Sequence, residues 1–194
     1  MSSELTYTPA PCFIIEDETA SDASAREALL DRVMGPGRRR KSSEKLRRGK
    51  LASPGLSFIA RNSEGKMVGS VRLWDVAVAE TPLLLLGPLA VEAATAGQGV
   101  GSALMRHAHL RAGEIGHGAI ILVGDAPYYQ RFGFSAHSTT GLMMPGPVER
   151  NRLLGLELRE GYLAGLSGLL VATGQRAVRT PVSARNVTPV TRVA

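Results

Sequence analysis

The chain has 194 residues, enough to bury one substantial core but too few for two domains of ordinary size. Hydrophobic residues make up 44% of the chain and charged residues 21%, which excludes a disordered or fibrous protein. The net charge of +6 is concentrated in residues 38–50 and 175–194, and the rest is mildly acidic, which argues against a main face that follows a phosphate backbone.

The sequence contains no run of about 18 apolar residues, and its first residues are polar and acidic where a signal peptide would be basic. We therefore expect no membrane span and a cytoplasmic location. Cys12 is the only cysteine, so an internal disulfide is excluded and a free structural thiol is expected.

The first predicted elements are a strand and a helix. Residues 12–16 form an apolar run typical of a strand, and Ser21 or Asp22 can cap a helix over residues 23–34. The apolar side of this helix is expected to contain Ala25, Leu29 and Val33.

The basic stretch that follows, residues 38–50, carries eight lysine or arginine side chains against the single acidic residue Glu44. We expect a short helix that ends at Gly49 and presents these charges to solvent. An RNA-binding role is the alternative, which the lack of aromatic stacking residues in this stretch disfavours.

Strand-rich sequence comes next. Residues 56–61 and 67–78 flank a turn at residues 62–65, which predicts an antiparallel hairpin. Residues 83–91 form the most apolar strand, and Gly87-Pro88 interrupts it. Because proline has no N–H, the ladder is expected to bulge at that point.

A glycine-rich turn then leads into a helix over residues 99–115, followed by a buried strand over residues 119–123. The apolar face of the helix is expected to contain Val100, Leu104, Ala108, Ala112 and Ile115.

The last part is expected to contain a short helix over residues 127–131 capped by Asp125, a strand that starts at Phe132-Gly133-Phe134, and a strand over residues 154–158. From Gly174 onward the sequence has no periodicity. One domain over residues 1–173 and a flexible basic tail over residues 174–194 are therefore predicted.

Residues 98–103 read QGVGSA and open the long helix directly after the buried strand. Small residues let the backbone approach a pyrophosphate, and the N–H groups at a helix start point at its oxygens. The sequence contains neither G-x-G-x-x-G at this turn nor G-K-[ST], so neither a dinucleotide nor ATP is favoured. A purely structural glycine turn is the alternative.

A second motif, GDAPYYQRFGF at residues 124–134, follows downstream. Together the two motifs resemble the GNAT acetyltransferase superfamily over roughly residues 55–160. Gln98, Gly101 and Ala103 fill its Q/R-x-x-G-x-G/A signature, and Tyr129 stands four residues before Gly133-Phe134. The strings GPLAV and GDAPYY are also similar to those of a branch of small bacterial predicted N-acetyltransferases.

The resemblance implies an α/β fold with a single mixed, mostly antiparallel sheet of six to seven strands flanked by helices, in which a splayed parallel strand pair forms the acetyl-CoA cleft. It implies direct attack of a primary amine, from a small molecule or a peptide, on acetyl-CoA without a metal. It makes Tyr129 the proton donor to the leaving thiolate. The implied acetyl-CoA-binding residues are Leu89, Ala90, Val91, Gln98, Gly99, Val100, Gly101, Ser102, Ala103 and Arg131.

Several assignments stay open. The general base is one of Asp75, Glu80, Glu92 and His137, or a water chain of the kind that many relatives use. Tyr128 is expected to be a packing residue, and His107 and His109 lie on different helix faces, which disfavours a shared metal. Residues 92–105 contain no lysine or arginine, so backbone N–H groups would bind the phosphates, with Arg106 or Arg131 nearby.

Two further functions remain as alternatives, and the oligomeric state, monomer or homodimer, is open. The first alternative is a non-catalytic acyl-CoA sensor, against which Tyr129 argues. The second is an RNA-associated acetyltransferase that acts on aminoacyl-tRNA through residues 38–50. In the superfamily the region after the first helix borders the acceptor pocket. The basic residues there are therefore also candidates for selecting an acidic acceptor.

Overall fold

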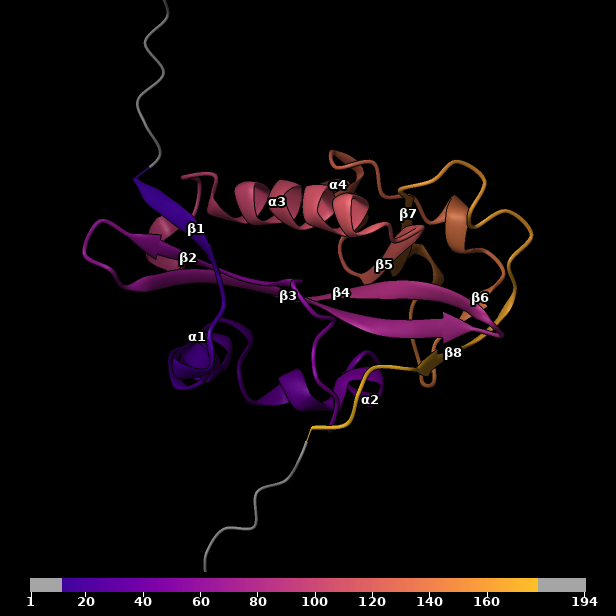
Figure 1. Cartoon of the computed structure of the whole chain (residues 1–194), viewed down its shortest axis with the longest axis horizontal. Coiled ribbons are helices and arrows are strands. Elements are labelled where there is room, and N and C mark those ends of the chain that lie inside the picture. Colours follow the sequence, from indigo (N-terminus) through magenta and orange to yellow (C-terminus); the bar gives the residue numbers. More distant parts are fainter. Residues whose placement is uncertain (1–11, 178–194) are drawn as a thin grey trace, which may run out of the picture.

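The computed structural model describes residues 12–177, which form one mixed sheet with helices on both faces (Figure 1). The strand order is β1-β2-β3-β4-β5-β7, and β8 pairs with both β3 and the short β6. The pairs β4–β5 and β6–β8 are parallel and the others are antiparallel. The strands are β1 Phe13–Asp17, β2 Ser57–Asn62, β3 Met67–Val78, β4 Thr81–Val91, β5 Ala119–Val123, β6 Leu142–Met143, β7 Leu153–Glu157 and β8 Gly168–Ala172.

The helices divide between the two faces of this sheet. Figure 1 shows α1 and α2 on one side of the β1–β4 ribbons and α3 on the other. The α-helices are α1 Ala23–Met34, α2 Glu44–Arg47, α3 Val100–Ile115 and α4 Ala126–Gln130, and the 3-10 helices are η1 Ala20–Asp22, η2 Pro36–Arg40, η3 Ala93–Thr95, η4 His137–Thr139 and η5 Arg150–Arg152. Among residues 12–177 no helix is long and apolar enough to cross a membrane.

The mixed, mostly antiparallel sheet is confirmed, but it has eight strands instead of six to seven. β6 has only two residues, and β8 has five, so each is too short to show a clear strand pattern in the sequence. The strand expected at Phe132–Phe134 is reduced to an isolated bridge between Ser135 and Gly155.

The larger hydrophobic core lies between α3 and the sheet. Val100, Leu104, Ala108 and Ala112 are buried as expected, whereas Ile115 is 47% exposed and Met105 is buried instead. Met105 lies three residues before Ala108 and therefore falls on the same buried stripe of the helix. Ile115 is the last residue of α3 and lies at the edge of the core.

The buried face of α1 also differs from the expected one. Ala25 and Val33 are exposed, and the buried residues are Arg26, Leu29 and Leu30. Arg26 is buried because it donates to Glu18, whose side chain is only 2% exposed.

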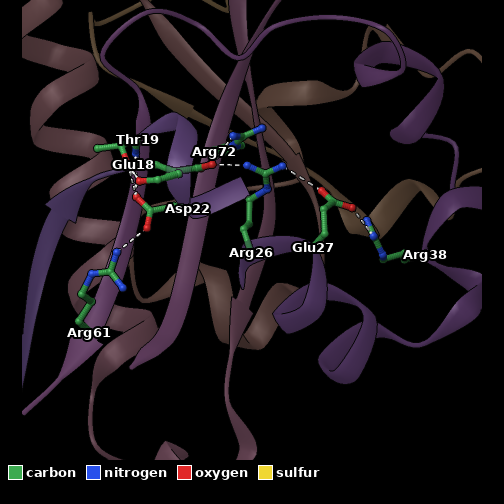
Figure 2. Close-up of polar contacts among 9 residues, drawn as sticks. Glu18, Thr19, Asp22, Arg26, Glu27, Arg38, Arg61 and Arg72 are labelled. Atoms are coloured by element: carbon green, nitrogen blue, oxygen red, sulfur yellow. Dashed lines mark hydrogen bonds and ion pairs between the residues drawn. The ribbon is translucent and has the colours of Figure 1, made fainter. Parts of the chain in front are cut away.

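Glu18 is the centre of a chain of ion pairs that joins the sheet to the helical layer (Figure 2). Arg72 of β3 donates through Nε to Glu18 at 2.6 Å, and Arg26 of α1 donates to the same carboxylate. Glu27 then accepts from Arg26 at 3.0 Å and from Arg38 of η2 at 2.5 Å. The ion pairs therefore connect β3, α1 and η2 in one continuous line.

The basic stretch is only partly a solvated face, which corrects the sequence-based expectation in part: Arg39, Arg40, Lys41, Lys45 and Arg48 are exposed, whereas Arg38, Arg47 and Lys50 are not. Arg38 is only 11% exposed because Glu27 and Asp31 both accept from it. Lys45 and Lys50 donate to the carbonyls of Pro145 and Gly174, each at 2.8 Å. Acidic and carbonyl partners from distant parts of the chain thus fold this stretch onto the protein.

Backbone pairing continues past the predicted domain end at residue 173. The N–H of Leu51 donates to Gln175 at 2.8 Å, and the N–H of Ala177 donates to Gly49 at 3.0 Å. The remaining part of the predicted tail, residues 178–194, lies outside the described residues.

Replacement of Glu18 tests the ion-pair chain. The change Glu18→Gln leaves the partly buried Arg72 without its carboxylate partner and the buried Arg26 with Glu27 alone, so we expect the free energy of unfolding to fall by about 3 kcal/mol. Urea denaturation measures the change. The control is Glu64→Gln on the exposed turn between β2 and β3, and an equal effect of both changes would contradict the role of Glu18.

Candidate active site

The parallel strands β4 and β5 separate after a short contact. They pair only at Leu84–Ile120 and Leu85–Ile121, after which β4 stays with β3 and β5 stays with β7. The second half of β4 therefore has one edge without a neighbouring strand. This separation confirms the expected splayed parallel pair.

A bulge lies at the point of separation. Leu86 opposes Leu73 and Leu89 opposes Val71, so that Gly87 and Pro88 together face a single residue of β3. The indole N–H of Trp74 donates to the carbonyl of Gly87 at 2.5 Å. The predicted bulge is therefore present, and a buried donor satisfies its carbonyl.

A cavity of about 490 Å³ fills the gap between the two strands. Its walls come from four parts of the chain: β4, the segment from the end of β5 into α4, the residue Arg152, and the α1–α2 region. The lining residues are Met34, Arg38, Lys41, Ser43, Glu44, Arg47, Leu86, Gly87, Pro88, Leu89, Val91, Leu122, Val123, Gly124, Asp125, Tyr128, Tyr129 and Arg152. We call this cavity the central cavity.

A second hollow of about 660 Å³ adjoins it and shares Lys41, Ser43, Val123 and Arg152 with it. Its other lining residues are Arg40, Ser42, Pro147, Val148 and Glu149. We call this hollow the side cavity.

The glycine turn at residues 97–101 lies at the start of α3. Gly97 and Gly99 both have a φ of 82°, which disfavours any residue with a Cβ. The N–H of Ala103 donates to Gly99 at 2.9 Å, so the N–H groups of residues 100–102 precede the first bond of the helix. These donors are positioned to bind an anion, while the side chain of Gln98 is exposed.

Contacts of Gly101 link this turn to the central cavity. A Cβ on Gly101 would lie 2.7 Å from the Tyr128 hydroxyl and 3.4 Å from Val91, and both residues line the cavity. The guanidinium of Arg131 lies 4.2 Å from the centre of the Tyr128 ring. The predicted residues Val91, Gly101 and Arg131 are thus brought together around Tyr128.

Residues 89–91 alternate between the two faces of β4. The side chains of Leu89 and Val91 line the central cavity, whereas Ala90 is buried with Leu29 and Leu30 under α1. Ala90 therefore contributes only its backbone to the free edge. Ser102 and Ala103 lie in the first turn of α3 and do not line the cavity described above.

Tyr129 lies in the wall of the central cavity. Burial raises its pKa to about 12, with Tyr128 and Asp125 acting in the same direction and Arg152 opposing them. The ring lies so close to Gly124 that a Cβ there would collide with it. The Tyr129 hydroxyl is therefore protonated at neutral pH, and its close packing on Gly124 fixes the position of the Tyr129 ring.

The four proposed bases lie elsewhere. Among the residues described, neither Asp75 nor Glu80 nor Glu92 nor His137 lines either cavity. Glu92 pairs with Arg32 at 2.9 Å, and this hydrogen bond lowers its pKa. The acidic residues that do line the central cavity are Glu44 and Asp125, and Asp125 makes no side-chain capping bond to α4, contrary to expectation.

Sequence reasoning missed most of the polar wall of the central cavity. Arg47, Glu44 and Lys41 belong to the basic stretch, for which only the position after the first helix gave a signal. No sequence motif pointed to Arg152. It lies at the cavity because the residue after it, Leu153, pairs with Val123 at the end of β5.

The two histidines of α3 have separate environments. His107 lies edge to face on Phe58 at 4.6 Å, and His109 contacts the rings of Phe132 and Phe134. The Nε2 atom of His109 is buried without a hydrogen-bond partner in the described part of the chain. Burial lowers the pKa of His109 to about 4. Within residues 12–177 no group of three or more His, Cys, Asp or Glu side chains is arranged to bind a metal.

Comparison with known proteins identifies relatives of this chain. The family described as "Acetyltransferase (GNAT) domain" matches residues 53–136. The uncharacterized N-acetyltransferase YhbS of Escherichia coli K12 is 30% identical over 159 residues, which cover 81% of this chain and 94% of that protein. The uncharacterized N-acetyltransferase YjhQ of the same strain is 36% identical over 135 residues, 66% of this chain and 73% of that one.

Solved structures agree. The crystal structure of E. coli YhbS in complex with CoA has a TM-score of 0.73 at 28% identity and covers 86% of this chain and 93% of that one. The crystal structure of a GNAT family acetyltransferase from Brucella melitensis in complex with acetyl-CoA has a TM-score of 0.53 at 26% identity. The match covers 76% of this chain and 97% of that one.

The buried His109 predicts acid sensitivity of the wall that carries Tyr129. Its pKa in the folded state is below the ordinary 6.5, so the unfolded chain binds the proton more tightly. The contribution of the neutral His109 to the free energy of unfolding is therefore fully present above pH 6.5 and is lost as the pH falls toward 4. We expect His109→Leu to reduce this loss, measured by urea denaturation from pH 8 to pH 4, relative to the exposed control His137→Leu. A pH dependence equal to that of the wild type would contradict the assignment.

Proposed function

The chain belongs to the GNAT acetyltransferase family, and we propose that it catalyses direct attack of a primary amine, from a small molecule or a peptide, on acetyl-CoA. The observation that carries this proposal is the central cavity, which lies between the splayed strands and has the protonated Tyr129 in its wall. No covalent enzyme intermediate is required. Acetyl-CoA supplies the activated acetyl group as a thioester, and the protein supplies the alignment and the proton transfers.

The donor site proposed here uses backbone groups. The N–H groups of residues 100–102 bind the diphosphate, aided by the dipole of the 16-residue helix α3. The free edge of β4 at residues 89–91 hydrogen-bonds the pantetheine arm, and Arg131, held against Tyr128, adds a positive charge beside the turn. Gln98 and Gly99 shape the turn.

Tyr129 is the proposed general acid. A buried phenol with a pKa of about 12 keeps its proton at neutral pH and donates it to the thiolate as the thioester breaks. Arg152 is positioned to stabilise the negative charge that develops on the sulfur, because its field already reaches the Tyr129 hydroxyl.

The amine must be neutral to attack. An alkyl ammonium with a pKa near ~10.4 is disfavoured as a nucleophile by roughly 4–5 kcal/mol at pH 7. Asp125 lines the cavity, is exposed to solvent and has a carboxylate that caps no helix, so we assign it to receive the proton directly or through water. A cytoplasmic location stays a prediction.

The alternatives receive less support from the described residues. A sensor has no use for a buried proton donor in the cavity wall. An RNA-binding face requires a broad set of free cations, whereas Arg38, Lys45, Arg48 and Lys50 each have an internal partner and Arg47 is buried. The acetyltransferase therefore explains more of the structure.

The donor site is tested by Gly101→Ala. The added Cβ would displace the Tyr128 hydroxyl and narrow the turn, so we expect the Kd for CoA to rise about tenfold, equivalent to ~1.4 kcal/mol. Isothermal titration calorimetry measures the Kd. The control is Gly113→Ala in the same helix, where a Cβ meets no atom within 4 Å and CoA affinity should stay constant. Unchanged affinity in Gly101→Ala would refute this placement.

The chemical step is tested by Tyr129→Phe. Loss of the proton donor should lower kcat about a hundredfold or more while CoA affinity is retained. Release of the CoA thiol over a panel of amines measures turnover. The matched control is Tyr162→Phe, because the Tyr162 hydroxyl donates to Pro82 at 3.0 Å away from the cavity. A kcat equal to that of the wild type would exclude Tyr129 as the acid.

A further inference from the structure

Arg47 is a buried cation with weak compensation. Its side chain is only 9% exposed, and Glu44 is its carboxylate partner at 3.3 Å. The same Nη2 atom lies 3.4 Å from the Ser43 hydroxyl, and the buried Nε has no partner among the described residues. Burying a charge without good partners is costly. The guanidinium therefore has unused capacity to bind an anion.

The neighbouring arginines of the helical layer and β3 have closer carboxylate partners than Arg47 has. Arg26 and Arg72 share the carboxylate of Glu18, and Arg38 has two acidic partners at 2.5 and 2.7 Å. Burial lowers the pKa of Arg47, whereas the acidic partners of Arg38 outweigh burial and raise its pKa. Arg47 is thus less well compensated than Arg26, Arg38 and Arg72.

The position of Arg47 points to the acceptor rather than to the donor. Its Nη1 lies 3.6 Å from where a Cβ on Gly87 would be, at the bulge of β4. The phosphate-binding turn instead contacts Val91, four residues further along the strand and so roughly 13 Å away. The donor's phosphates are therefore at the other end of the central cavity.

The surrounding walls have an excess of positive charge. Glu27 and Asp31 offset the charge of Arg38, so the remaining cations across the central and side cavities are Arg40, Lys41, Arg47 and Arg152, and the anions are Glu44, Asp125 and Glu149. An acceptor that is only a cation would be repelled here. An acceptor that also carries an anion would be attracted.

We propose that the acceptor amine carries a carboxylate or phosphate group, which binds to Arg47 with Lys41 and Arg152 close by. This inference rests on the proposed acetyltransferase function and specifies its substrate class. The amine then reaches the thioester at the bulge of β4, on the side of Tyr129.

Matched acceptor pairs test the proposal. Phosphoethanolamine is compared with ethanolamine, and an amino acid with its amide, with CoA release as the readout. We expect at least one anionic member to have a kcat/KM about tenfold or more above that of its neutral partner, as for a charge-assisted hydrogen bond. The two pairs distinguish a phosphate from a carboxylate. Equal values in both pairs would overturn the proposal.

The residue is tested by Arg47→Met, which keeps an unbranched apolar stem and removes the guanidinium charge. Because the buried guanidinium is poorly paired, methionine should preserve thermal stability and CoA affinity. The preference for the anionic acceptor should fall about tenfold, mainly through KM. Arg48→Met is the control, since Arg48 is exposed and lines neither the central nor the side cavity. A preference retained in Arg47→Met would overturn the assignment.

Binding separates this inference from the proposed function. If the wild type binds CoA but acetylates no amine, the function fails. Thermal stabilisation of the CoA complex by inorganic phosphate and by the anionic amines then decides the inference. Stabilisation that is lost in Arg47→Met but kept in Arg48→Met would support an anion site at Arg47. Stabilisation that is equal in both variants, or absent in the wild type, would refute it.

Discussion

The central constraint is that β4 and β5 share only two paired positions before they diverge. The bulge at Gly87-Pro88 turns β4 away, and the Trp74 indole holds the bulge by binding the Gly87 carbonyl. Everything at the site follows from this divergence. The free edge of β4, the cavity, and the place where α4 presents Tyr129 exist only because no strand occupies the gap.

The ion-pair chain extends this arrangement into the other wall. Arg72 lies opposite the bulge, and its carboxylate partner Glu18 also binds Arg26 of α1, which leads through Glu27 to Arg38 at the cavity (Figure 2). Buried pairs of this kind add little net stability, because desolvation offsets most of the attraction. Their effect is positional, since each arginine has a defined acidic partner and η2 is fixed relative to β4.

Local signals predicted the parts of the fold that local chemistry determines. Periodicity located α1 and α3, the missing N–H of Pro88 located the bulge, and small residues located the turn before α3. The sequence indicated the basic region after α1 but not which of its residues reach the cavity, because the position of Arg38 is fixed by Glu27 and Asp31, and that of Arg152 by the pairing of β5 with β7. Charge partners that are distant in sequence leave no periodic pattern.

The positive wall also has a chemical consequence for the proposed reaction. A cation close to Arg47 and Arg152 is disfavoured by like charge, so the pKa of an acceptor ammonium is lowered there. An anionic group on the same molecule offsets the repulsion at the binding step and leaves it acting on the amine. The same arginines thus attract the acceptor and favour its neutral, nucleophilic form. Tyr129, whose pKa is raised by burial, stays protonated beside them and completes the proton balance when the thiolate leaves.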